Sequence, residues 1–428
     1  MPRHRTRAGS AGLLLAEEPR SWADGGQCGS VSHSVGACSP RRKASVWCAP
    51  RAGVMTARVL VDATAISVTP SGVRTRVVCL FSAYRAMFDD PTPVVVVTKV
   101  SGLAEILGDA GVTTISVPAR PGPAQRMLAN SRTWSRRLGD TGAAALHLET
   151  PPVPRHLGVP MALELHDLRS FDDLAFALTS RGIYQRYFLR SAVRRVDHVI
   201  TPTRYGASII AGRLRVEPAT IHVVPGAGPP HATAPSQVEI DQFLQRHGAT
   251  SPFILGVGHL ERRKNFGLLI DAVRMLDAER GVRHSVVIIG QDHGRAAELR
   301  RFASEPPAVA LTLTGAVSES EKWAAIAGAS CLVMPSLVEG FGLVAVEAMS
   351  LGCPVLAAKA TALPEVVGDG ALLFDPRDAS ELGSCLRSIM TDGALAAGLV
   401  ERGTSRSAEF TWSASAERLH AAYEELLS

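Results

Sequence analysis

Short β-branched runs alternate with segments of helical spacing from residue 57 onward. The run RVLVDA is followed by the turn TPSGVRTR and then by VVCLFSAYRAMF, whose apolar residues recur at helical intervals. The order repeats with TPVVVVTK, the helix-like GLAEILGDAG and TTISV, and further strands are expected at AALHLE, PMALELHD and VDHVITPT. Strands separated by helices indicate βαβ units, so we predict a parallel sheet covered by helices on both faces.

A second series of the same kind follows a break rich in Pro, Gly and Ala at residues 220–236. It starts with PFILGVG and the helix NFGLLIDAVRMLDAE and continues through SVVIIG, ALTLTGAV, SCLVMPS, PVLAA and GALLFDP. The last segment, TWSASAERLHAAYEELL, has the pattern of one amphipathic helix. We therefore predict an α/β protein of two facing Rossmann-like domains, 56–228 and 229–409, followed by a C-terminal helix over 410–428.

The composition is that of an ordinary globular protein, with 46% hydrophobic and 20% charged residues in 428. No run reaches the roughly 18 to 20 apolar residues of a membrane helix, which argues against a spanning role. The formal net charge of +5 arises entirely within residues 1–55, which hold eight Lys/Arg and three Asp/Glu. Because the remainder is balanced, its net charge gives no sign of nucleic-acid binding.

Residues 1–55 show no sustained periodicity, so we expect a disordered extension or a mis-assigned start. Met55 is the expected natural first residue, because the ordered pattern begins at ARVLVDAT. Enrichment in Arg and Ser is also typical of a transit peptide, but Glu17, Glu18 and Asp24 argue against one. The cysteines of this segment are too far apart for a C-x₂-C zinc clip, and the others occur in apolar contexts typical of reduced thiols. We therefore expect a cytoplasmic protein.

The stretch PSLVEGFGLVAVEAM places Glu339 and Glu347 on either side of a Gly-Phe-Gly turn that begins a helix. Gly340 and Gly342 allow a ligand to approach the backbone, and the N–H groups at Gly342 and Leu343 form an anion site at the positive end of the helix dipole. A diphosphate bound there would have one carboxylate beside its sugar and one beside its ribose, which fits a sugar nucleotide. The alternative is one glutamate that favours the helix dipole and a second that is solvated.

The loop FILGVGHLERRKNFGLL presents Arg262, Arg263 and Lys264 after a strand. Cations there would pair with a diphosphate and stabilise the charge on a departing nucleotide without a metal. The alternative is a solvated basic turn capped by Asn265. GVGHLE is also similar to half of a dinucleotide fingerprint, but Glu261 stands at the third glycine position and no P-loop pattern occurs. Dehydrogenase and P-loop functions are therefore disfavoured.

Two loops of the first half are candidates for the acceptor side. His166 and Asp167 end a strand in ELHDLRSF, where the histidine can share a proton or bind substrate and the aspartate can orient it. The alternative is a capping aspartate beside a structural histidine. Ser71 and Gly72 form another glycine turn before a helix, or else a plain tight turn. Ligands bind beyond the carboxyl ends of parallel strands, so the loops of both halves should line one cleft.

Taken together, these segments resemble glycosyltransferase family 4, the retaining sugar-nucleotide-dependent transferases of the GT-B fold, from about residue 57 to the C-terminus. The most specific likeness is the E-x₇-E signature of MPSLVEGFGLVAVEAMSLGCPV and the residues after it. GHLERRKN is similar to the family's diphosphate-binding loop, and LTGAVSESE, around Gly315 and Val317, to its base-contacting loop. SGVRTR and LELHDL are similar to the N-terminal glycine loop and the histidine-aspartate strand end.

The resemblance implies a role for each group. Donor-binding residues would be Arg263, Lys264, Gly315, Val317, Glu339, Gly340, Phe341, Gly342, Leu343 and Glu347. Catalysis would involve His166, Lys264 and Glu339, and the acceptor side Ser71, Gly72, His166 and Asp167. The implied reaction moves a hexose-type sugar from a nucleotide-diphosphate sugar to a saccharide or lipid-linked acceptor, with retention and without a metal or other cofactor, in cell-surface polysaccharide or glycolipid synthesis. The C-terminal helix would cross back onto the N-terminal domain.

The chain departs from the family pattern at three places. His259 stands where many members carry arginine, Arg74 where glycine is common, and VPGAGPP replaces the usual linker sequence. Two other functions stay open: a non-catalytic nucleotide-sugar-binding protein, and a sugar-nucleotide epimerase that would turn over donor without acceptor.

The segment RGIYQRYFLRSAVRR raises the question of membrane contact. Two stripes repeat every four residues, a basic one of Arg186, Arg190 and Arg194 and an apolar one of Tyr184, Phe188 and Ala192. Such a helix can lie against anionic lipid at the inner membrane face. The alternative packs its aromatic residues into the core and leaves the arginines solvated.

Overall fold

The computed structural model describes residues 58–428 with the exception of 67, 68, 70, 119–122, 156, 173, 230–233 and 282. The described residues belong to one compact unit. The expected extension, residues 1–55, lies outside the described residues.

The first half forms a seven-stranded sheet in the order β3-β2-β1-β4-β5-β6-β7, and all of its pairs are parallel. Its strands are β1 (Arg58–Asp62), β2 (Thr92–Thr98), β3 (Thr113–Val117), β4 (Ala145–Leu148), β5 (Met161–Glu164), β6 (His198–Thr201) and β7 (Ile221–Val223). The predicted parallel sheet is thus confirmed. The prediction places residues 220–236 in a break without a strand, but Ile221–Val223 form β7 at the edge of the sheet. Two of its three residues are β-branched, and the strand ends shortly before Pro225.

The second half forms a six-stranded sheet in the order β10-β9-β8-β11-β12-β13, again with parallel pairs throughout. Its strands are β8 (Phe253–Val257), β9 (Ser285–Ile289), β10 (Ala310–Gly315), β11 (Cys331–Met334), β12 (Val355–Ala358) and β13 (Ala371–Phe374). The two sheets confirm the predicted pair of Rossmann-like domains.

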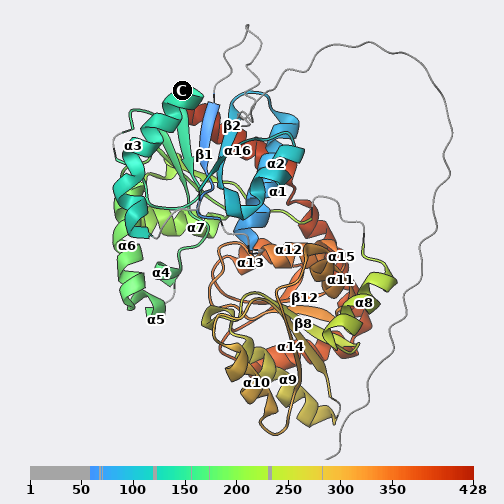
Figure 1. The fold of residues 1–428 in the computed structure, drawn as a ribbon. Helices are drawn as coiled ribbons and strands as arrows, with labels where there is room; N and C mark the ends of the chain where they lie inside the picture. The colour runs from blue at the N-terminus through green and yellow to red at the C-terminus, as the bar shows by residue number, and fades with distance from the viewer. Residues whose placement is uncertain are drawn as a thin grey trace, which may run out of the picture. The chain divides into compact units, whose positions relative to one another are not determined.

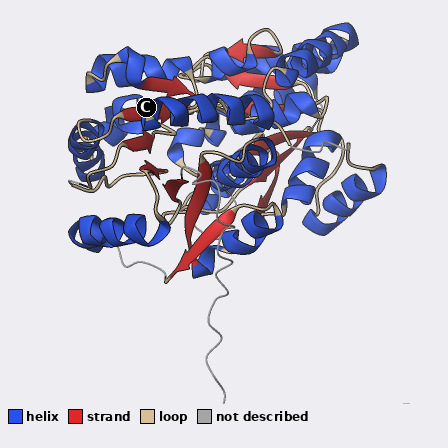
Figure 2. Ribbon diagram, turned by 90° about the horizontal axis from the view of Figure 1, so that it is seen from above, coloured by secondary structure: helices blue, strands red, loops and turns tan. Residues whose placement is uncertain are grey.

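Helices follow the strands and cover both sheets (Figures 1 and 2). In the first half they are α1 (Gly72–Met87), α2 (Leu103–Asp109), α3 (Pro123–Thr141), α4 (Arg169–Asp172), α5 (Leu174–Ala177), α6 (Ser180–Val193) and α7 (Arg204–Ile209). In the second half they are α8 (Gln237–His247), α9 (Phe266–Arg280), α10 (Ala296–Ser304), α11 (Glu319–Gly328), α12 (Leu343–Ser350), α13 (Leu363–Val367), α14 (Ala379–Thr391), α15 (Gly393–Ala408) and α16 (Trp412–Leu427).

Burial on both faces explains the nearly continuous hydrophobic strands. In β1, Val59 and Val61 pack into the cluster that contains α1 and α16, whereas Leu60 packs into the cluster on the opposite face. Successive strand residues point to opposite faces, so a strand buried on both sides needs apolar residues at every position. A third cluster fills the second domain.

The last helix, α16, returns to the first domain and packs along α1 (Figure 1). Its first residue, Trp412, donates its indole N–H to the carbonyl of Gly228 at 2.8 Å. The Ser415 hydroxyl donates to the carbonyl of Pro225 at 2.9 Å. These bonds attach the helix to the segment that joins the two domains.

The stripes expected on α6 are only partly present. Arg186 donates to the carbonyl of Ser170 and lies over an aromatic ring, so it is not a free surface charge. Ala192 is buried and Phe188 half-buried, while the side chain of Tyr184 lies outside the described residues. Among the helices that the structure describes, none is both long and apolar enough to cross a membrane.

Candidate active site

A cavity of about 330 Å³ lies at the carboxyl ends of strands from both sheets. Its walls include almost every residue predicted from the sequence, namely Ser71, Gly72, His166, Asp167, Arg263, Lys264, Val317, Glu339, Gly340, Phe341, Gly342, Leu343 and Glu347. Gly315 is the exception: it ends β10 with a φ of 77°, and the next two residues reach the cavity in its place. The loops of both halves therefore line one cleft.

Two hydrogen bonds and one longer ion pair hold the carboxylate of Glu339 in this cavity. The Lys264 ammonium lies 2.5 Å from Oε1 and the Ser336 hydroxyl donates to the same oxygen at 2.7 Å. The Arg263 guanidinium is 3.7 Å from Oε2. Burial alone would raise the pKa of Glu339, but Lys264 and Arg263 outweigh it and hold that pKa below its ordinary value. The carboxylate is therefore ionised and can only accept hydrogen bonds.

The cations come from a single turn of 3-10 helix, Arg262–Lys264. The turn ends at Asn265, which adopts a left-handed φ of 54°. Lys264 reaches the cavity over Gly258, where a Cβ atom would lie 2.7 Å from its Cε. Arg262 is exposed and does not line the cavity, so for this residue the solvated alternative holds.

The Gly-Phe-Gly turn brings the two domains into contact. A Cβ atom on Gly340 would lie 1.7 Å from the carbonyl oxygen of His166, and the Gly340 carbonyl accepts a hydrogen bond from Thr203 at 3.2 Å. Gly342 precedes α12 with a φ of 95°, a left-handed conformation that favours glycine. Ala345 donates its amide to the Gly342 carbonyl at 2.8 Å, whereas Leu343 and Val344, the first two residues of α12, line the cavity at the positive end of the helix dipole.

Glu347 is buried inside α12, and only one of its oxygens is paired. Lys322 lies 2.8 Å from Oε1 and also 2.8 Å from Glu319. Oε2 has no hydrogen-bond partner among the described residues, although Glu347 lines the cavity. Burial raises the pKa of Glu347, and Lys322 only partly opposes that effect. A ligand hydroxyl would satisfy the unpaired oxygen.

His166 faces a buried carboxylate at each ring nitrogen. Its Nδ1 is 3.3 Å from Glu164 and its Nε2 is 3.3 Å from Glu149. Burial lowers the pKa of His166, but the two carboxylates outweigh it and raise that pKa above its ordinary value. Neither Nε2 nor the Glu149 carboxylate makes a hydrogen bond among the described residues, so their contact is an ion pair at most.

Glu164 also lies 2.5 Å from Arg76. Burial alone would raise the pKa of Glu164, but Arg76 and His166 outweigh that effect and lower it. On the far side, His147 lies 3.6 Å from Glu164 and its Nδ1 is 2.7 Å from the hydroxyl of Tyr423 in α16. The C-terminal helix therefore contacts the charged cluster beneath the cavity.

The remaining predicted residues have simpler surroundings. Asp167 accepts a hydrogen bond from the Arg169 amide at 3.4 Å, so it is Glu149 and Glu164, and not Asp167 as expected, that face the ring nitrogens of His166. Ser71 caps α1 by accepting from the Arg74 amide at 3.3 Å.

Sequence reasoning missed Glu149, Glu164, Arg76 and Lys322. A signal existed for the two carboxylates, because MALELHD and ALHLE place an ionisable residue at or directly after the end of a buried strand, where an unpaired charge is costly. Lys322 had no such signal, since it stands 25 positions from Glu347.

Two family models match the chain. Residues 68–227 match the model described as Glycosyltransferase Family 4, and residues 238–406 match the model described as Glycosyl transferases group 1. Together they account for more than half of the chain.

Curated relatives include MMP alpha-(1->4)-mannosyltransferase of Mycolicibacterium hassiacum, 31% identical over 56% of this chain and 56% of that protein. O-antigen chain mannosyltransferase B of Escherichia coli is 30% identical over 41% of this chain and 47% of that protein. The chain thus spans about half the length of these relatives.

Solved structures show the same fold at low identity. Anabaena Alr3699/HepE in complex with UDP-glucose has a TM-score of 0.68 at 18% identity, covering 86% of this chain and 99% of that one. WaaG, a glycosyltransferase involved in lipopolysaccharide biosynthesis, has a TM-score of 0.66 at 16% identity, covering 85% and 98%. The fold is GT-B, and with both halves matched in order by the two family models, the chain belongs to glycosyltransferase family 4.

Proposed function

We propose that the protein is a retaining hexosyltransferase that moves a sugar from a nucleotide-diphosphate donor to a saccharide or lipid-linked acceptor, in cell-surface polysaccharide or glycolipid synthesis. One observation carries the proposal: Glu339 and Glu347 flank the start of α12 in the cavity that also holds Lys264. Mannose is the first sugar to test, because several relatives are named as mannosyltransferases.

The donor occupies the second domain in this proposal. Its diphosphate meets the amides at the start of α12 together with Arg263 and Lys264, which lie within reach of the same cavity. Glu339 accepts hydrogen bonds from the sugar hydroxyls, and the unpaired oxygen of Glu347 accepts from the ribose. The positive charges of Arg263 and Lys264 offset the negative charge that develops on the departing diphosphate, so the mechanism does not call for a metal.

In this proposal His166 positions the substrate beside the donor and does not transfer a proton. Its ring nitrogens face Glu164 and Glu149, so we do not assign it the proton of the acceptor hydroxyl. The oxygen of the departing diphosphate gains basicity as its bond to the sugar breaks, and we assign the proton to that oxygen. Closure of the domains would keep water from competing with the acceptor.

We further propose a cytoplasmic location with peripheral contact at the inner membrane face. The exposed face of α6 carries Ile183 and Tyr187, at 59% and 70% exposure, followed by Arg190 and Arg194. These four residues follow the i, i+4, i+7, i+11 spacing of one helical face, and Leu178, 70% exposed, precedes them. Apolar residues beside arginines suit an anionic lipid surface, which a lipid-linked acceptor would require.

The test is a donor panel. The protein is incubated with UDP-, GDP- and ADP-linked hexoses, with and without EDTA, and nucleotide release is followed beside Glu339→Ala. We expect EDTA-insensitive release from one donor and its loss in the variant. If no donor is turned over and none raises the melting temperature, the proposal fails.

The same panel separates the rival functions. A non-catalytic binding protein would be stabilised by one donor without releasing nucleotide. An epimerase would convert the donor sugar without acceptor and without releasing nucleotide, which chromatography of the donor would reveal.

A further inference from the structure

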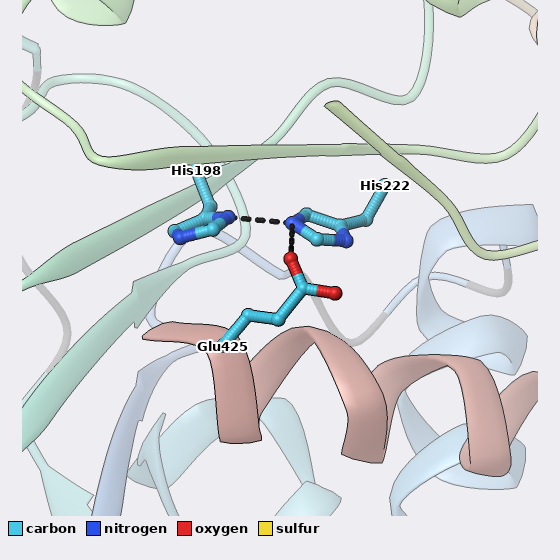
Figure 3. A group of neighbouring side chains, drawn as sticks. All are labelled: His198, His222 and Glu425. Carbon is cyan, nitrogen blue, oxygen red and sulfur yellow. Dashed lines mark hydrogen bonds and ion pairs between the residues drawn. The ribbon is translucent and has the colours of Figure 1, made fainter. Parts of the chain in front are cut away.

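Three side chains that can bind a metal converge away from the cavity (Figure 3). His198 begins β6, His222 is the central residue of β7, and Glu425 lies in the last turn of α16. None of the three lines the cavity between the domains. His198 stands at the amino end of its strand, whereas the cavity lies at the carboxyl ends of the strands. The transferase proposal therefore assigns them no role.

Their ligand atoms are close to one another. His198 Nδ1 is 2.5 Å from His222 Nε2, and the same His222 nitrogen is 3.8 Å from Glu425 Oε2. Four-coordinate zinc binds nitrogen and oxygen at about 2.0 to 2.2 Å, so neighbouring ligand atoms are about 3.3 Å apart. The two observed distances lie on either side of that value. Small changes in side-chain torsion would bring all three atoms to one ion.

The three groups differ in their exposure to solvent. The side chain of His222 is 14% exposed, so most of this ring is shielded from solvent. Glu425 is 60% exposed at its side chain and gives the site access to solvent. As Figure 3 shows, the carboxylate rises from α16 toward the two rings on the sheet.

We propose that His198, His222 and Glu425 bind one divalent transition metal of the zinc class. Two imidazoles and one carboxylate form a borderline-soft donor set that suits zinc and leaves a fourth position for water. Because the ligands come from two strands and the C-terminal helix, the ion fastens the end of α16 to the first sheet. Trp412 and Ser415 already attach the beginning of that helix.

A second group with ligand atoms at similar spacing, His147, Glu149 and Glu164, does not offer the same opportunity. Arg76 already pairs with Glu164 and His166 with both carboxylates, so a further cation would meet two positive charges. Tyr423 occupies one nitrogen of His147.

The test is a Zn²⁺ titration of the full chain without an affinity tag, followed by competition with a fluorescent zinc chelator. We expect the wild type to bind one equivalent more than His222→Ala, and Glu425→Ala to bind that equivalent at least tenfold more weakly. Glu417→Ala, on the same helix and also exposed, should bind as the wild type does. Equal stoichiometry and affinity in the wild type and both ligand variants would overturn the proposal.

A second readout keeps the test valid if His222→Ala does not fold. Zn²⁺ should raise the melting temperature of the wild type and of Glu417→Ala but not of Glu425→Ala, because a ligand that binds only the folded state stabilises it.

Nucleotide release should be unchanged in Glu425→Ala, since this residue is remote from the cavity. Zinc binding at the cysteines of residues 1–55 would appear equally in all variants, so it does not mimic the expected difference. A zinc-dependent rise of the same size in Glu425→Ala would contradict the proposal.

Discussion

Two buried carboxylates, Glu149 and Glu164, lie against the ring of His166, and Arg76 pairs with the second of them. Glu149 and Glu164 are almost fully buried, and Arg76 and the His166 ring balance their charges. Removing one partner from a buried pair leaves an uncompensated charge, which costs about 3 to 5 kcal/mol. The cluster therefore raises the pKa of His166, a residue of the cavity wall.

This arrangement predicts the titration of His166. Its pKa is raised in the folded protein, so the protonated ring contributes stability that is fully present below the unfolded value of about 6.5 and is lost as the pH rises through the folded pKa. Glu149→Gln should lower that pKa and remove part of the pH dependence of unfolding, whereas the exposed control Glu105→Gln should not. NMR of ¹⁵N-labelled histidine and urea unfolding at several pH values measure both effects. A wild-type His166 that titrates below 6.5 would contradict this account.

The pair of Glu347 and Lys322 makes a different prediction. Glu347→Gln removes the buried one of the two carboxylates that pair with Lys322, so unfolding should become easier. The variant should also bind donor about tenfold more weakly if the unpaired oxygen accepts from the ribose. Adding Lys322→Met should restore stability without restoring donor binding. Urea unfolding and donor titration of both variants separate the two effects. Recovery of donor binding in the double variant would show that Glu347 acts only through stability.

At the scale of elements, the turn before α12 is constrained by space. Gly340 lies against the backbone of His166 across the two domains. Gly342 needs a left-handed backbone, and a Cβ atom added to it would lie 2.6 Å from the side chain of Leu363. Neither position accepts a larger residue without a shift of its surroundings. The elements are thus joined where the donor is expected to bind.

Gly340→Ala should therefore separate the two loops and reduce nucleotide release at least a hundredfold, because an error of about 1 Å in positioning costs about that much. Gly108→Ala is the matched control, because Gly108 lies in helix α2 and a Cβ atom added to it would meet no atom within 4 Å. Release assays and thermal melts of both variants provide the comparison. Wild-type release by Gly340→Ala would show that this contact is not needed.

The sequence was sufficient for most elements and for the cavity wall. Alternation of apolar runs with helical segments predicted both sheets, because a strand buried on both faces must be apolar throughout. It missed β7, whose three residues are too short a pattern to stand out beside a Pro/Gly-rich segment. It also missed the partners of His166, since the pairing of Arg76 with Glu164 joins positions 88 residues apart and depends on how helix and sheet pack.

At the scale of the whole molecule, the domains meet at several points around the cavity. Thr203 bonds to the glycine turn, and the amides of Arg204 and Tyr205 donate to the Glu365 carboxylate at 2.8 and 2.7 Å. The chain returns to the first domain through α16, where the hydroxyl of Tyr423 contacts His147 of the buried cluster. The two domains are therefore connected by direct contacts as well as by the linker.

The central claim is that the cations of the second domain act on a donor diphosphate inside the cavity. The most direct test compares kcat/KM of the wild type, Lys264→Ala and Arg262→Ala with the donor found in the panel. Both variants lose one positive charge from the same turn, but only Lys264 lines the cavity. We predict a loss of about 100- to 1000-fold for Lys264→Ala and a change of no more than about twofold for Arg262→Ala. Equal losses in the two variants, or full activity in Lys264→Ala, would contradict the account.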